Sequence, residues 1–179
     1  MRLEEHQERL RRKRTAPAAR RRGSNAAGDA LRVAVGADHG GFGLKAQVVA
    51  LLRELGVLVE DLGTHALEPV DYPDVAVAVA RRVASGAVRF GILVDAAGLG
   101  SCMAANKVRG VRAATCHDEI TARNSREHND ANVLVLGSRV VSRGHARRLV
   151  RLWLDTPFAA GRHARRVAKI DALDAERPG

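Results

Sequence analysis

The feature that most constrains this chain is a regular alternation between short apolar runs and segments with helical periodicity. Apolar runs of strand length lie at residues 31–37, 57–61, 89–94, 111–115 and 132–136. Helical patterns follow them at residues 42–55, 73–85, 102–107, 117–127 and 142–154. Strands that alternate with helices pair in parallel and need cover on both faces. We therefore predict an α/β fold, a three-layer αβα sandwich around a five-stranded parallel sheet.

Glycine and proline residues mark the ends of the predicted helices. Pro73 suits the first residue of a helix, and Gly56 and Gly86 each follow the end of one. Pro157 ends the pattern of residues 142–154. A basic segment, 161–166, then precedes a last short helix that we expect to end near residue 175.

The length and the charge distribution predict one domain with a basic extension. The chain has 179 residues and a net charge of +10, and residues 1–28 hold nine basic and three acidic residues, or +6 of that charge. We predict that residues 1–28 are disordered, because they contain too few large apolar residues to form a core. The alternative is a basic helix that docks on a protein or an acidic surface.

Residues 29–179 form the predicted domain, with a C-terminal helical segment. This domain lacks the basic face with interleaved aromatic residues that stacks nucleic-acid bases, although association of the extension with nucleic acid stays open.

Several classes of protein are disfavoured by missing patterns. No apolar run approaches the roughly 18 residues of a membrane helix, and the charged N-terminus is unlike a secretory signal, so we expect a cytoplasmic protein without a membrane partner. Cys102 and Cys116 form no CxxC pair. The chain contains no His-x-His or HExxH motif, and no Gly-Lys-Ser/Thr follows its glycines, so we expect neither a metal nor a cofactor.

A turn of small residues follows the third predicted strand and provides the first candidate for catalysis. Asp95 ends the strand, and residues 96–101 are small except for Leu99. A strand–turn–helix unit presents backbone N–H groups to an anion, and parallel sheets bind ligands at the carboxyl ends of their strands. A carboxylate beside such donors can take a proton from carbon while the donors hold the resulting oxyanion. The alternative is that Asp95 only caps the following helix.

Other candidates fall at one edge of the predicted sheet or at the opposite one. The carboxyl edge would gather Asp38, His39, Tyr72, Asp95, the residues of the small turn, His117, Asp118 and Arg139. His128 and Asn129 follow a helix and should lie at the opposite edge. They would meet the others only across a subunit contact, or if that helix is unusually placed. This mismatch predicts a dimer whose sites are shared.

Simpler structural roles are open to several of these residues. Asp38 suits a turn, and His128 suits a donor at the end of a helix. Arg162 and Arg166 are four residues apart on one helix face, which is usually solvated. Their guanidinium groups could instead clamp a phosphate.

Five motifs in register resemble the ribose-5-phosphate isomerase B family, which includes the galactose-6-phosphate isomerase subunits. The motifs are Asp38-His39-Gly40-Gly41-Phe42 with Leu44-Lys45, Asp71-Tyr72-Pro73-Asp74, Gly98-Leu99-Gly100 with Ala104-Ala105-Asn106-Lys107, His128-Asn129-Asp130-Ala131-Asn132, and Gly161-Arg162-His163. The resemblance covers residues 31–175. It implies a Rossmann-like fold, a homodimer or homotetramer with sites between subunits, and metal-free aldose–ketose isomerisation of a phosphorylated sugar.

The resemblance also implies a role for each matching residue. Asp38 and His39 would contact the sugar, His128 would open its ring, and Asn129 would lie beside it. Tyr72 joins the substrate-binding residues. The enediolate would be held by backbone N–H groups of Ala96, Ala97, Gly98, Leu99 and Gly100. The phosphate would be held by Arg139, Arg162 and Arg166, with His163 helping.

The chain departs from the family pattern at the reaction centre. That pattern reads Cys-Gly-Thr/Ser-Gly with the cysteine as base, whereas this chain has Asp95-Ala96-Ala97-Gly98. A subset of the family uses a glutamate further on, where this chain has Ser101 next to Cys102. We predict that Asp95 is the base, with Cys102 as the alternative. The expected reaction converts ribose 5-phosphate and ribulose 5-phosphate through a cis-enediolate. A four- or six-carbon sugar phosphate, or a catalytically silent sugar-phosphate-binding protein, is the alternative.

Overall fold

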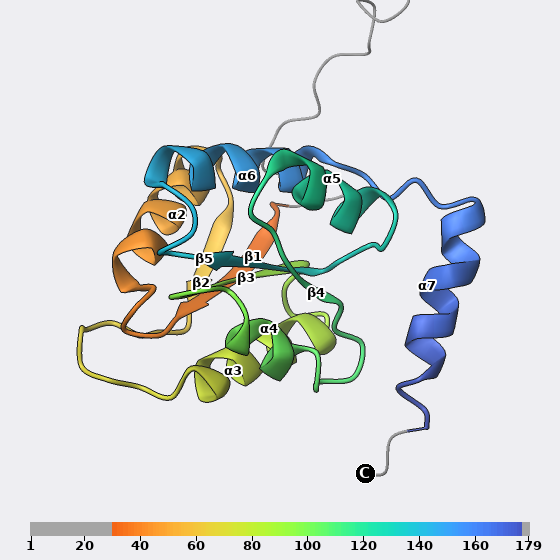
Figure 1. The fold of residues 1–179 in the computed structure, drawn as a ribbon, viewed down its shortest axis with the longest axis horizontal. Coiled ribbons are helices and arrows are strands. Elements are labelled where there is room, and N and C mark those ends of the chain that lie inside the picture. The colour runs from red at the N-terminus through yellow and green to blue at the C-terminus, as the bar shows by residue number, and fades with distance from the viewer. Residues whose placement is uncertain (1–29, 177–179) are drawn as a thin grey trace, which may run out of the picture.

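The computed structural model describes residues 30–176, and the extension predicted over residues 1–28 lies outside this range. Five parallel strands form one sheet in the order β2-β1-β3-β5-β4 (Figure 1). The α/β fold and the five-stranded parallel sheet are confirmed. The strands are β1 (Arg32–Ala37), β2 (Leu58–Asp61), β3 (Phe90–Asp95), β4 (Ala113–Thr115) and β5 (Val133–Gly137). The helices are α2 (Phe42–Glu54), α3 (Tyr72–Ala84), α4 (Gly100–Ala105), α5 (Glu119–Glu127), α6 (Arg143–Asp155) and α7 (Arg162–Ala172).

Helices cover both faces of the sheet, as its apolar strands require. Helices α2, α5 and α6 lie on one face, and α3 and α4 lie on the other (Figure 1). Side chains alternate between the two faces, so Ile92 packs with the α2 and α6 layer while Leu93 packs with the α3 layer. Every residue of β3 is buried, because this strand is the centre of the sheet. Trp153 of α6 is fully buried and meets the Phe90 ring edge-on.

The first residues of two helices differ from the predicted ones. Helix α5 begins at Glu119 rather than at His117, because the Asp118 side chain accepts a hydrogen bond from the Thr121 N–H at 2.7 Å. The Thr121 hydroxyl completes a capping box at the Asp118 N–H. Helix α4 begins at Gly100, inside the stretch expected to be a turn.

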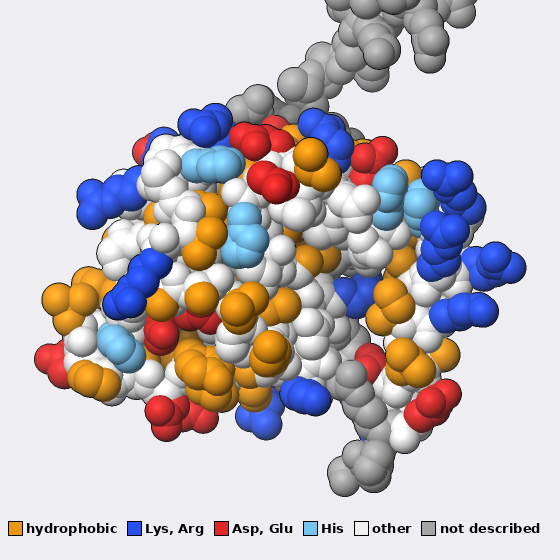
Figure 2. All heavy atoms as spheres, in the orientation of Figure 1, with side chains coloured by type: hydrophobic (Ala, Val, Ile, Leu, Met, Phe, Trp, Pro, Cys, Tyr) orange, Lys and Arg blue, Asp and Glu red, His pale blue; other side chains and the backbone are white. Residues whose placement is uncertain are grey.

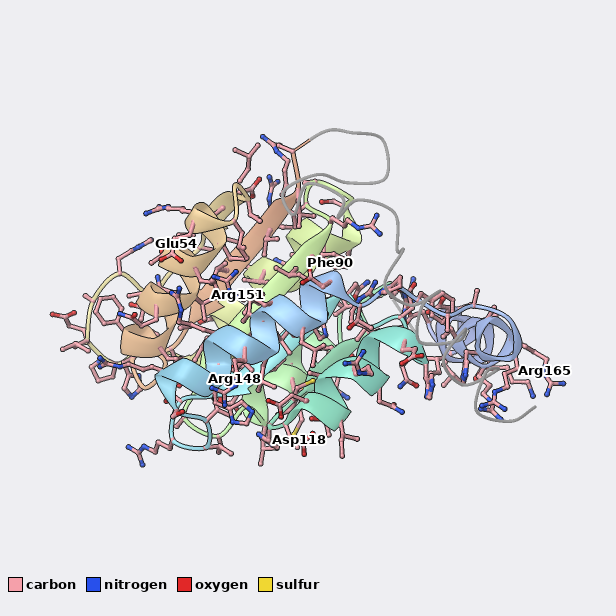
Figure 3. All side chains as sticks on the ribbon, turned by 90° about the horizontal axis from the view of Figure 1, so that it is seen from above. Glu54, Phe90, Asp118, Arg148, Arg151 and Arg165 are labelled. Carbon is pink, nitrogen blue, oxygen red and sulfur yellow. The ribbon has the colours of Figure 1, made fainter. Side chains whose placement is uncertain are left out.

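Ion pairs join α2 to α6 on the outer surface of their layer. Arg147 Nη2 lies 2.7 Å from Glu54 Oε2, and Arg151 Nη2 lies 3.8 Å from the same oxygen. Figure 3 shows Glu54 and Arg151 on these neighbouring helices. Exposed pairs of this kind contribute little to stability, so the buried apolar contacts beneath them hold the two helices together.

Helix α7 stands apart from the two helical layers (Figure 1). It is tied to the body by an ion pair between Arg112 Nη1 and Asp171 Oδ1, 2.8 Å long, and by a hydrogen bond from the Gly110 N–H to Asp174. A cavity of about 360 Å³ separates it from β4 and α5. Arg165 projects from the far side of this helix (Figure 3). Within residues 30–176, the helices are all too short or too polar to cross a membrane.

Candidate active site

Three turns meet at the carboxyl edge of the sheet, as the alternation predicts. The Ser138 N–H donates to the Asp95 carbonyl at 2.8 Å, and the Arg139 N–H donates to the Ala96 carbonyl at 3.0 Å. The Ser138 hydroxyl donates to the Gly40 carbonyl at 2.7 Å. The turns that follow β1, β3 and β5 are therefore joined directly to one another, and Arg139 is placed beside the small-residue turn.

The turn after β1 holds Asp38 and His39 against its neighbours. Asp38 Oδ1 accepts the Gly41 N–H at 2.8 Å, so its side chain has the turn role that the sequence also allowed. A Cβ on Gly41 would lie 2.1 Å from the Val94 carbonyl oxygen, so this close approach requires glycine. His39 Nδ1 accepts the Val70 N–H at 3.4 Å, which ties the loop before α3 to the same edge.

The Asp95 carboxylate is folded into the turn that follows it. The side chain is 5% exposed, and its Oδ1 accepts the N–H groups of Ala97, at 2.9 Å, and Gly98. Its Oδ2 accepts the Ser101 N–H at 3.0 Å. The capping interpretation of Asp95 therefore describes this structure. Two of the N–H groups expected to face an enediolate, those of Ala97 and Gly98, are bonded to Asp95 instead. A carboxylate has about four acceptor positions, so one remains on Oδ2.

The rest of the turn leaves backbone donors and places Tyr72 over them. Within the described residues, the N–H groups of Leu99 and Gly100 meet no acceptor. The Tyr72 ring lies against Gly100, where an added Cβ would be 2.6 Å from its Cε2 atom. Gly98 has a positive φ of 80°, and its carbonyl accepts the Thr115 hydroxyl. Thr115 belongs to no sequence motif, and it reaches the turn through this hydrogen bond and through its methyl group beside Gly98.

The alternative base, Cys102, is directed at β4. Its Sγ lies 3.4 Å from the Ala113 carbonyl oxygen and 3.5 Å from Asn106 Nδ2. The residue is half-buried and packs against the core beneath α3 and α4. The thiol therefore lies on the side of α4 that faces the sheet, and its contacts there are with Ala113 and Asn106.

A second cluster lies where α5 ends and α7 begins. The His128 and His163 rings are stacked, with centroids 4.1 Å apart and an angle of 6° between their planes. Arg162 Nε donates to His163 Nε2 at 3.4 Å. Figure 2 shows histidine side chains beside the Lys and Arg side chains that line α7. Burial, repulsion from Arg162 and Arg166, and repulsion from His128 whenever that ring is protonated lower the pKa of His163, and Glu127 opposes this change.

One chain does not bring the two clusters together. His128 and Asn129 follow α5 and precede β5, so they lie near the amino ends of the strands, whereas Asp95 lies at the carboxyl ends. The expectation that they occupy opposite edges is confirmed. Arg162 and Arg166 are exposed on α7, next to His128 rather than next to Asp95. His117 and Asp118 cap α5 after β4.

Asn124 is a further candidate residue that no sequence motif marks. Its Nδ2 lies 2.9 Å from His128 Nδ1. The spacing of four residues on one helix was the available signal, because such residues are neighbours on a helix surface. Over residues 30–176, His, Cys, Asp and Glu side chains form no group of three that could hold a metal ion.

The fold and comparison with known proteins together define an α/β sugar-phosphate isomerase. Residues 33–170 match the Ribose/Galactose Isomerase family, and the chain belongs to this family. Ribose-5-phosphate isomerase B from Escherichia coli is 47% identical over 82% of this chain and 98% of its own length. D-erythrulose-4-phosphate isomerase from Pectobacterium atrosepticum is 38% identical over 78% of this chain and 93% of its own. The structure of Clostridium thermocellum ribose-5-phosphate isomerase B superposes with a TM-score of 0.81 at 47% identity, covering 82% of this chain and 99% of that one.

Proposed function

We propose that this protein interconverts ribose 5-phosphate and ribulose 5-phosphate by proton transfer through a cis-enediolate. Its class, a sugar-phosphate aldose–ketose isomerase, follows from its family. The observation that carries the proposal is the joined turn edge, where Asp95, the free N–H groups of Leu99 and Gly100, and Tyr72 lie together. The pentose is favoured over a tetrose because the E. coli and C. thermocellum relatives named for ribose 5-phosphate are 47% identical, against 38% for the erythrulose-4-phosphate isomerase.

In the proposed reaction, Asp95 moves the proton between the two carbons. Its remaining acceptor position on Oδ2 takes the proton next to the carbonyl and returns it to the neighbouring carbon. The N–H groups of Leu99 and Gly100 hold the enediolate oxygen, which is the charge that develops during the reaction. Asp38 and His39 contact sugar hydroxyl groups from the turn after β1.

The complete site in this proposal is shared between two copies of the chain. A second copy supplies His128 and Asn129 for ring opening, and Arg162 and Arg166 grip the phosphate together with Arg139. Ile170 and Leu173 of α7 are about half exposed beside the cavity between α7 and β4, and they offer apolar side chains to that copy next to polar ones such as Asn129. We propose a homodimer as the smallest assembly with complete sites.

Substitution of residue 95 tests the role of Asp95. We expect Asp95→Asn to lower kcat by about 100- to 10,000-fold, the usual contribution of general acid–base catalysis. Asp95→Cys should retain more activity than Asp95→Asn, because a thiolate can also carry the proton. Glu176→Gln, the loss of an exposed carboxylate far from the turn, is the matched control. If Asp95→Cys and Asp95→Asn lower kcat equally and also lower the melting temperature equally, Asp95 only shapes the turn.

The sugar is tested by measuring kcat/KM for phosphorylated aldoses of four, five and six carbons. Ribose 5-phosphate should give the highest value. A higher value for a tetrose or hexose phosphate would contradict the pentose assignment while leaving the class of enzyme intact.

Mixing two inactive variants tests the shared site. Asp95→Asn and His128→Asn subunits, unfolded and refolded together, should recover about a quarter of the wild-type activity, because half of the random dimers contain one intact site. No recovery, with mixed dimers present by mass spectrometry, would show that each site lies within one chain.

A sugar-phosphate-binding protein without turnover is the second candidate. The three backbone hydrogen bonds to Asp95 favour it, because they use most of the acceptor capacity of the carboxylate. It predicts binding of ribose 5-phosphate by calorimetry without exchange of a carbon-bound hydrogen in D2O. Exchange at C2 would exclude it.

A further inference from the structure

A polar network at the end of α5 surrounds His128, and one of its members, Asn124, has no role in the mechanism above. Asn124 lies one helical turn before His128, and its Nδ2 is 2.9 Å from His128 Nδ1. Asn129 Nδ2 lies 3.1 Å from Asn124 Oδ1 and 3.2 Å from the Asn124 carbonyl oxygen. Asn124 is therefore the link between two residues assigned to the substrate.

The network determines which way the Asn124 amide is turned. Asn129 donates to Asn124 Oδ1, so this atom is the acceptor and Asn124 Nδ2 is the donor toward His128. His128 Nδ1 must then accept, and a neutral imidazole that accepts at Nδ1 carries its hydrogen on Nε2. The reversed amide would lose the Asn129 bond and bring two donors together.

The stacked partner of His128 is held in a complementary way. Arg162 donates to His163 Nε2, which leaves the hydrogen of a neutral His163 on Nδ1. The charged and titratable groups that face His163 are His128, Arg162, Arg166 and Glu127, and burial together with the two arginines lowers the pKa of His163, which favours the neutral ring. The stack fixes the plane of the His128 ring, and Asn124 fixes its rotation within that plane.

We propose that Asn124 is a positioning residue that holds His128 as the Nε2–H tautomer, so that Nε2 donates a hydrogen bond to the ring oxygen of the sugar. The contact with the sugar rests on the proposed function, whereas the tautomer does not. Asn124 is exposed on α5, so its side chain can be changed without opening the core.

Nitrogen NMR of the imidazoles in the full chain tests the tautomer directly. The signals of His128 are identified by their loss in His128→Asn. We expect protonated Nε2 and unprotonated Nδ1 at pH 8 in the wild type. Asn124→Asp replaces the donor by an acceptor and should move the hydrogen to Nδ1. Asn124→Leu should give a mixture of tautomers. Arg123→Ala, at the neighbouring exposed position, should leave the spectrum unchanged.

Steady-state kinetics on ribose 5-phosphate test the consequence. Asn124→Leu should lower kcat about 10-fold, the effect of one hydrogen bond, and Asn124→Asp should lower it further at pH 8. An Nδ1–H tautomer in the wild type, or a changed tautomer with unchanged kcat, would overturn the proposal. If the wild type shows the Nε2–H tautomer, lost in Asn124→Asp, but turns over no sugar phosphate, the tautomer assignment stands and the proposed function fails.

Discussion

The ammonium group of Lys45 lies 2.6 Å from Asp61 Oδ1 and 2.7 Å from the carbonyl oxygen of Thr64. Lys45 is only 2% exposed, although it belongs to an otherwise apolar helix face. Asp61 also accepts the Gly63 N–H at 3.2 Å. Asp61 is only partly buried, and its pair with Lys45 joins α2 to the end of β2 and to the start of the loop that leads to Tyr72.

Replacing Lys45 with Met should destabilise the fold by about 3 kcal/mol, because removing one partner leaves the other charge partly buried and unpaired. Urea unfolding measures the free energy. The double variant Lys45→Met with Asp61→Asn should lose less than Lys45→Met alone. If the two variants lose the same free energy, the pair contributes no coupling.

Alanine at Gly41 and at Gly43 should have opposite effects. Gly41 has no room for a Cβ, which would lie 2.1 Å from the Val94 carbonyl oxygen, so Gly41→Ala should cost about 1–3 kcal/mol or more and lower activity. Gly43 lies in α2 with open space around it, so Gly43→Ala should stabilise the helix by about 0.5–1 kcal/mol. Thermal unfolding of both variants checks this, and equal melting temperatures would contradict it.

Gly100 and Tyr72 should be coupled energetically. Gly100→Ala places a Cβ within 2.6 Å of the Tyr72 ring and should cost about 1–2 kcal/mol as well as substrate affinity. In a Tyr72→Ala background the same change should cost less, because the ring that it displaces is gone. A double-mutant cycle measures this coupling, and strict additivity would count against the contact.

Burial makes Cys116 an inert thiol. It raises the pKa of Cys116 from its usual 9.0 to about 11. The folded state therefore keeps this proton to higher pH than the unfolded state, and the contribution of Cys116 to stability should be complete below pH 9 and decline as the pH rises toward 11. Urea unfolding of the wild type and Cys116→Ala, compared from pH 8 to 11, should show a steeper loss in the wild type.

Reaction with a thiol reagent gives an independent measurement of the same burial. At pH 8 the native protein should expose at most one reactive thiol, Cys102, and the denatured protein should expose both cysteines of the chain. Two reactive thiols of equal rate in the native protein would contradict the burial of Cys116.

The fold followed from the sequence because its signals are local. Strand length and helical spacing define elements such as β3 and α6 without reference to the rest of the chain. The position of His128 opposite Asp95 followed in the same way, from counting strands and helices. The direction of the Asp95 carboxylate did not, because spacing shows that N–H groups are near but not where they point. The partner of Lys45 was also hidden, since its charge lies on a helix face whose pattern predicts only apolar contacts.

The meeting of Ser138 with Asp95 and Gly40 has a consequence for how this edge can change. Two of the three bonds that join the turns run between backbone atoms, and the third ends on a backbone carbonyl. The attachment of these turns to one another therefore does not depend on the side chain of residue 95, whereas the internal shape of the turn after β3 does, because Asp95 accepts three of its N–H groups. A substitution at position 95 should loosen this single turn while Ser138 and Arg139 keep it docked at the edge of the sheet.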